Sequence, residues 1–177
     1  MSDLHDKIVA QRGKLSNIVA KIPGFKGYIE KESRRSADRM LRDHLAGSLD
    51  NLILRYDTIV ADILDLEGGL SMMSNARQSR DKIKAYRDRI STAAPKYAGL
   101  FADVKVDEAA LDRIYAFDEA QIIYVDKLKA VVDRLASAVD ANEGIKALID
   151  ETYDLALEAN EAFKLRDDEI MDISSTL

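Results

Sequence analysis

The sequence predicts an all-α protein, an elongated antiparallel helical bundle of four long helices plus a shorter N-terminal helix. Three observations support this fold class. Only 2 prolines and 8 glycines interrupt 177 residues, whereas strands need frequent turns. Good helix formers such as Ala, Leu and Lys are abundant. Apolar residues also recur at alternating spacings of three and four, which marks one face of a helix.

The most regular of these patterns is the stretch Leu45–Leu66. Its apolar positions are Leu45, Leu49, Leu52, Tyr56, Ile59, Ile63 and Leu66. We expect a helix that begins between Gly27 and Ser33 and ends at Gly68-Gly69. Ala46-Gly47-Ser48 inside it permits a kink or the close approach of a neighbouring helix. The stripe Val125–Val139 has matching spacing, so this coiled-coil pattern is expected to pack within the chain.

A shorter helix is expected at the N-terminus, from Leu4 to Ile22. Gly13 weakens it by about 1 kcal/mol relative to Ala. Pro23-Gly24 stops it, because proline cannot continue a helix. Basic residues lie elsewhere on its surface, at Lys7, Arg12, Lys14 and Lys21. This pattern is compatible with a helix lying on a membrane surface, but packing against the second helix is the preferred interpretation.

Three more helices are expected further along the chain. The first runs from Leu70 to about Ala94, where Pro95 terminates it. The second begins at Asp107, whose side chain is suited to cap a helix N-terminus, and runs to about Val139. The third continues from Ile145 to about Asp172, after a short break.

One connection, Pro95–Val106, is long and rich in apolar and aromatic residues. A loop of this length and composition must bury itself. If the helices alternate in direction, it lies at the same end as the turn Pro23–Tyr28, and the two segments could pack together as a cap. All of these elements can share one core, so we expect a single domain, residues 1–177.

The composition is that of a soluble globular protein, with 47% hydrophobic and 33% charged residues and no cysteine. The absence of cysteine excludes disulfides, thiolate metal sites and cysteine nucleophiles. No apolar run is long enough to cross a membrane, and we expect a cytoplasmic location. Residues 1–95 carry an excess of basic side chains and residues 96–177 an excess of acidic ones.

Two segments resemble parts of uncharacterised bacterial all-helical proteins. The first is Pro23–Asp38, which reads Pro-Gly-Phe-Lys-Gly-Tyr-Ile-Glu-Lys-Glu and then Arg-Arg-Ser-Ala-Asp from Arg34. The second is Asp103–Tyr115. Together they cover about a sixth of the chain, and the resemblance implies no named activity.

Most catalytic and cofactor motifs are missing. Glu-x-x-His, the ligand pair of di-iron bundles, does not occur. The only histidines, His5 and His44, fall on different predicted helices, and we expect each to face solvent. Gly68-Gly69 lacks the lysine and the preceding strand of a phosphate-binding loop. We therefore expect no metal, no cofactor, no catalytic residues and no small-molecule substrate.

Arg39 and His44 are similar in spacing to the Arg-x4-6-His pair of the HEPN family of all-helical RNA-cleaving domains. That resemblance would imply that the arginine and the histidine act on a phosphodiester. Met40 departs from the pattern, because the family usually has a polar residue at that position. An RNA-cleaving enzyme is accordingly the third hypothesis for function.

Two basic stripes stand out as candidate binding sites for an anionic partner. They comprise Lys31, Arg35, Arg39 and Arg42 on one helix, and Arg77, Arg80, Lys84 and Arg87 on the next. Spacings of three and four place each set on one helix face. The preferred alternative is that the basic stripes face the acidic stripe Glu151, Asp154, Glu158 and Glu161, inside the bundle or in a dimer, and that nearby carboxylates at Asp38, Asp43, Asp81 and Asp88 neutralise them. Aromatic residues are not interleaved with the arginines, so we do not expect nucleic acid as a partner.

The sequence therefore predicts a non-enzymatic structural or protein-interaction bundle, which either forms a homo-oligomer or binds a protein partner along a helical face. The alternative is a peripheral membrane or filament-forming scaffold that binds anionic surfaces through its basic helix faces.

Overall fold

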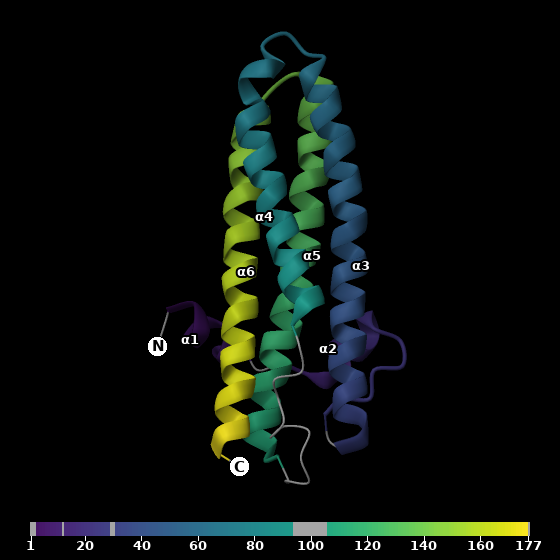
Figure 1. Cartoon of the computed structure of the whole chain (residues 1–177), viewed down its shortest axis with the longest axis vertical. Coiled ribbons are helices and arrows are strands. Elements are labelled where there is room, and N and C mark those ends of the chain that lie inside the picture. The colour runs from purple at the N-terminus through teal and green to yellow at the C-terminus, as the bar shows by residue number, and fades with distance from the viewer. Residues whose placement is uncertain (1–2, 12, 29–30, 94–105, 177) are drawn as a thin grey trace.

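The computed structural model describes residues 3–11, 13–28, 31–93 and 106–176. Its four long helices are α3 (Lys31–Leu64), α4 (Met73–Thr92), α5 (Glu108–Ala141) and α6 (Ile145–Thr176). They stand side by side in an elongated bundle, and each runs antiparallel to the next along the chain (Figure 1). The described residues contain helices and no strand, which confirms the predicted all-α class.

The order of the helices around the bundle is α3, α4, α6 and α5. Helices α4 and α5 are consecutive in the chain but lie diagonally opposite, so the connection between them joins non-adjacent helices. The predicted aromatic loop Pro95–Val106 belongs to that connection. Residues 94–105 lie outside the described residues, and so does the expected packing of this loop. Val106, at its end, is buried.

The core is built from the apolar stripes of the four long helices. On α3, Leu45, Leu49 and Ile63 are completely buried, and the neighbouring helix α5 contributes Leu128 and Val132. Burial of each such side chain contributes about 1.5–3 kcal/mol. The two heptad stripes therefore pack within the bundle, as the sequence predicts.

The turn between α3 and α4 differs in detail from the prediction. Helix α3 ends at Leu64, and a short 3₁₀ helix, η1 (Gly69–Met72), precedes α4. Gly68 has φ = 79°, a backbone conformation that favours glycine. The suggested role of Gly47 in close helix approach is wrong, because nothing lies within 4 Å of the position its Cβ would occupy.

The predicted single N-terminal helix is also wrong, because the segment forms two helices, α1 (Asp3–Ala10) and α2 (Leu15–Lys21). Both lie near the end of the bundle where α3 begins and α6 ends (Figure 1). Between them Gly13 lies on the backbone of α5, where a Cβ would come within 2.1 Å of Ala116 N. The chain therefore breaks at Gly13 to cross α5. We call α1 and α2 together the N-terminal arm.

The ends of α5 follow ordinary capping chemistry. The side chain of Asp107 accepts a 2.6 Å hydrogen bond from Ala110 N, which confirms the predicted N-cap. At the other end Asn142 has φ = 51° and Gly144 has φ = 72°, so the short break before α6 uses left-handed residues. Helix α6 continues to Thr176, beyond the expected end at Asp172.

Candidate functional site

The side chains of the basic stripe on α3 differ in exposure and in ion pairing. Lys31 begins the helix, and Arg35 is exposed. Arg39 is exposed and forms an ion pair with Asp43 at 3.5 Å. Arg42 instead turns inward, and its Nε donates a 2.9 Å hydrogen bond to Asp38. Two of the carboxylates predicted to neutralise this stripe therefore do so.

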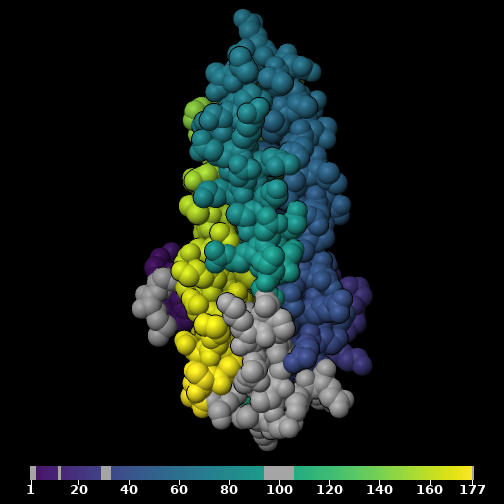
Figure 2. Space-filling view, viewed as in Figure 1, coloured from purple at the N-terminus to yellow at the C-terminus, as the bar shows by residue number. Residues whose placement is uncertain are grey.

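The basic stripe on α4 mainly holds that helix against α3. Arg80 forms a two-point ion pair with Asp57, with 2.9 Å between Nη2 and Oδ2. Arg87 lies 2.9 Å from Asp50 and 2.9 Å from Asp88. Arg77 and Lys84 are exposed. Figure 2 shows the face that α4 dominates, between α6 and α3.

The acidic stripe on α6 contacts α5 and not the basic stripes. Glu151 accepts a 2.7 Å hydrogen bond from Arg134, and Glu158 accepts one of 2.6 Å from Tyr124. The predicted pairing between the acidic stripe and the two basic stripes is therefore wrong within the chain. Ion pairs with Asp50 and Asp57 of α3 hold α4 in place instead. The sequence analysis did not identify these two residues.

The histidines occupy two different environments, and the prediction that both face solvent is wrong for His5. The side chain of His5 is only 16% exposed, lies 3.1 Å from Glu169 and packs against Phe117. His44 is partly buried, and burial together with the nearby Lys129 lowers its pKa. Arg39, its partner in the HEPN-like spacing, is paired with Asp43; the enzyme hypothesis stays a prediction.

A buried ionic cluster joins three helices and the turn before α3. Arg166 on α6 is fully buried, and its Nε donates a 2.7 Å hydrogen bond to Asp118 on α5. Its Nη2 donates one of 3.0 Å to Asp38 on α3. The hydroxyl of Tyr28 donates a 2.7 Å hydrogen bond to Asp118. Each carboxylate thus has a charged donor, as buried charges require.

Hydrogen bonds extend this cluster outward in two directions. Arg34 is buried, and its Nε donates a 2.7 Å hydrogen bond to the carbonyl oxygen of Tyr28. The backbone N–H of Tyr28 donates to the hydroxyl of Tyr115 at 3.1 Å. Burial raises the pKa of the Asp118 carboxyl, against the opposing effect of Arg166. Burial also raises the pKa of Tyr28. The cluster fixes the relative positions of α3, α5 and α6.

The sequence reading missed Asp118 and Arg166, although their spacing contains the signal. Asp118 and Gln121 continue the α5 stripe between Ile114 and Val125, at positions where an apolar residue is expected. Arg166 likewise falls between Phe163 and Ile170 on α6. A polar residue at a core position of a helix stripe predicts a buried polar network.

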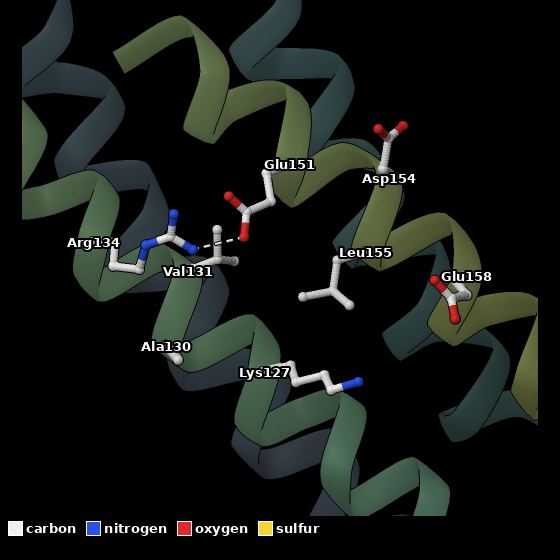
Figure 3. A pocket seen from close by; sticks show the side chains of 8 residues that line it. All are labelled: Lys127, Ala130, Val131, Arg134, Glu151, Asp154, Leu155 and Glu158. Carbon is white, nitrogen blue, oxygen red and sulfur yellow. Dashed lines mark hydrogen bonds and ion pairs between the residues drawn. The ribbon is translucent and has the colours of Figure 1, made fainter. Parts of the chain in front are cut away.

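A surface groove with a volume of about 380 Å³ lies between α5 and α6 (Figure 3). The groove-lining residues are Lys127, Ala130, Val131, Arg134, Glu151, Asp154, Leu155 and Glu158. Val131 and Leu155 supply apolar surface, α5 supplies the basic side chains and α6 the acidic ones (Figure 3). The ion pair between Arg134 and Glu151 crosses one end of the groove (Figure 3).

Helix α1 occupies the same seam further toward the end of the bundle where α3 begins. A cavity of about 190 Å³ separates α1 from α5 and α6, and it shares Lys127 and Glu158 with the open groove. Ile8 of α1 is 3% exposed, and Leu4 packs against the core. The seam between α5 and α6 is thus filled by a helix over part of its length and open over the rest.

Comparisons with protein-family models, with curated proteins and with solved structures give no match for this chain. Among the residues the structure describes, no group of three or more His, Asp or Glu side chains is placed to hold a metal ion. No helix in the described segments is long and apolar enough to span a membrane.

Proposed function

We propose that the chain is a non-enzymatic interaction bundle of the cytoplasm, which binds a protein partner or a second copy of itself along a helical face. The observation that supports this proposal is the open groove between α5 and α6. Its apolar floor, formed by Leu155 and Ala130 above the buried Val131, is flanked by Lys127 and Arg134 on one side and by three carboxylates on the other. An apolar strip between polar rims is the usual anatomy of a protein-binding surface.

Contrast with the opposite side of the bundle favours this location. Helix α4, which is diagonal to α5, exposes no large apolar side chain at any of its residues, all of which are described. The face of α5 and α6 leaves Ala130 exposed beside the partly exposed Leu155 of the groove, and Ile123, which is 37% exposed, lies further along the seam beside α1. The α4 face and the α5–α6 face therefore differ in exposed apolar surface, and burial of such surface drives most protein association.

The membrane-scaffold alternative has weaker support. One possible membrane-binding surface is the apolar side of the N-terminal helices, but Ile8, Ile18 and Ile22 on it are buried. The other possible membrane-binding surface is the pair of basic stripes, but Arg42, Arg80 and Arg87 on them form ion pairs with carboxylates. Binding of the remaining exposed basic residues to an anionic surface stays a prediction, which co-sedimentation with anionic vesicles at low and high salt would test.

The interaction proposal is tested by filling the groove. Ala130→Trp places a large side chain on the groove floor at an exposed position. Ala85→Trp makes the same change at an exposed position on α4 and serves as the matched control. We expect a partner retained from the native cell, or an oligomer detected by light scattering, to be lost with Ala130→Trp and kept with Ala85→Trp. Equal behaviour of the two variants contradicts the proposal.

A further inference from the structure

We infer that the open part of the α5–α6 groove binds a basic amphipathic helix of another protein. This inference rests on the proposed function and goes beyond it by naming the partner's chemistry. Three properties carry it: the helix already seated in the same seam, the floor of the groove and the charge of its walls.

Helix α1 shows what kind of segment the seam accepts. Leu4 and Ile8 are four residues apart, so they lie on one face of α1, and that face points into the seam. Two side chains of α1 lie near carboxylates of α6: His5 lies 3.1 Å from Glu169, and Lys7, whose ion pair is with Asp3 of α1 itself, lines the same cavity as Glu158. A short helix with an apolar i, i+4 pair therefore fits this seam, and its polar side chains come within reach of the carboxylates of α6.

The open groove repeats the conditions met by α1. The partly exposed Leu155 and the exposed Ala130 offer an apolar floor above the buried Val131, and the small side chain of Ala130 leaves room for a helix to approach closely (Figure 3). The groove and the cavity beside α1 share Lys127 and Glu158, so the surface continues from one to the other. A second helix in the groove would extend the arrangement that α1 begins.

The charges of the walls select a basic helix. Arg134 is paired with Glu151, and the Lys127 ammonium lies 5.5 Å from the centre of the Tyr124 ring. On the α6 wall Asp154 forms no ion pair with any described residue, and Glu158 accepts a hydrogen bond from the neutral hydroxyl of Tyr124 and interacts electrostatically with Lys7 of α1. The groove thus carries an excess of negative charge, which attracts a cationic partner and repels an anionic lipid surface.

A second copy of the chain fits these requirements less well. Its basic face on α4 exposes no large apolar side chain. Its helix α3 exposes Leu54 and Leu64, but the exposed carboxylates of Asp50 and Asp62 on the same helix would meet the acidic wall of the groove. Its own α1 already has its apolar face buried against α5 and α6. The observations therefore favour a separate protein as the source of the helix.

The test uses the full chain and two synthetic helical peptides with the same Leu residues at i, i+4 and i+7. One peptide carries Lys along one flank of the Leu stripe, and the other carries Glu at those positions. Fluorescence anisotropy should show binding of the Lys peptide and about tenfold weaker binding of the Glu peptide. High salt should reduce the difference, because these charges are exposed.

Charge reversal in the groove should invert this preference. In the double variant Asp154→Lys with Glu158→Lys, the Glu peptide should become the tighter ligand, while Ala130→Trp should abolish binding of both. The matched control is Asp81→Lys with Asp88→Lys on α4, which should leave both affinities unchanged.

Several outcomes overturn the inference. These are no binding of either peptide, equal binding of both, or a preference for Lys that survives the reversal at Asp154 and Glu158. If the Lys peptide fails but Ala130→Trp still removes a native partner, the interaction function stands and the basic helix is wrong. If Ala130→Trp removes only self-association, the occupant is a second copy. If Ala130→Trp changes nothing, both proposals fail.

Discussion

The two halves of helix α5 are buried in different ways. Between Ile114 and Val125 nearly every side chain is buried, because the other helices enclose one side and the N-terminal arm crosses the other. Beyond Val125 the inward stripe stays buried, but the outward residues Lys127, Ala130 and Arg134 are exposed. We call these the covered half and the open half.

The cores of the two halves differ as well. The covered half contains the ionic cluster of Asp118 and Arg166, together with Gln121, which accepts a 2.8 Å hydrogen bond from the buried Tyr86. The open half contains only apolar residues on the α5 stripe, from Val125 to Val139. Charged groups in a core restrict how the helices can pack, at an energetic cost, whereas apolar layers add stability but restrict the packing arrangement less. The covered half is therefore the part that fixes register, and the open half is the part free to receive a partner.

The sharpest test of this contrast is removal of the buried guanidinium. Arg166→Met keeps much of the side-chain volume but leaves Asp118 and Asp38 without their shared donor. We expect the free energy of unfolding, measured by urea denaturation at neutral pH, to fall by about 3–5 kcal/mol. Arg134→Met removes an exposed arginine of the open half and should cost less than about 1 kcal/mol. Similar losses in both variants would show that the two halves do not differ in this way.

The next test compares two glycines. Gly13→Ala places a Cβ against the backbone of Tyr115 and Ala116, so we expect a loss of about 1–3 kcal/mol through displacement of the arm. Gly47→Ala lies in open space within α3 and should stabilise the protein by about 0.5–1 kcal/mol.

Amide hydrogen exchange locates the effect of these substitutions. In Gly13→Ala, protection should fall for the amides of α1 and α2 before it falls in the core of α3. A uniform loss of protection across the bundle would mean that the arm and the bundle unfold as one unit, contrary to the division into covered and open halves.

These two glycines also show what the sequence could predict. Heptad spacing predicted four long helices and their buried faces, because a helix face follows directly from residue period. It matched the stripe of α3 with that of α5, but it could not predict the order of all four helices around the bundle, because any two apolar stripes of similar spacing can pack together. The role of Gly13 depends on the approach of α5, which is distant in sequence. For the same reason spacing placed Arg80 and Arg87 on one face without identifying Asp57 and Asp50 as their partners.

The candidate groove was only partly predictable. The acidic residues at Glu151, Asp154 and Glu158 share a helix face, as their spacing predicts. The basic wall, Lys127 and Arg134, comes from another helix, and no local pattern links the two. The polar stripe positions Asp118 and Arg166 carried a readable signal, since each replaces an expected apolar residue.

A smaller effect is expected from the two ends of α5. Asp107→Ala removes the hydrogen bond to Ala110 N at the start of the covered half, and it should cost about 1 kcal/mol. Asp140→Ala removes an exposed carboxylate in the last turn, where the helix dipole disfavours negative charge, and should be neutral or slightly stabilising. Thermal unfolding of both variants measures the difference. A loss with Asp140→Ala as large as with Asp107→Ala would contradict the assigned cap.

The smallest effect should come from His44, which lies where the arm ends. Burial and the ammonium groups of Lys129 and Lys21 lower the pKa of His44, while Asp126 opposes this. The unfolded chain then binds a proton at a higher pH than the folded chain does. His44 therefore contributes stability above its unfolded pKa of about 6.5, and this is lost as the pH falls through its folded pKa.

The comparison with His44→Gln isolates this contribution. The wild-type protein should lose stability between about pH 7 and pH 5, and the variant should show a flatter profile over the same interval. A variant with an unchanged slope would assign the pH dependence to other groups. Because Lys21 belongs to α2, the single variant Gly13→Ala tests whether the arm supplies part of the shift in the pKa of His44. Displacing α2 should raise this pKa toward its usual value, so Gly13→Ala should lose less stability than the wild type over this pH range. The double variant Gly13→Ala with His44→Gln, which lacks the histidine, is the control.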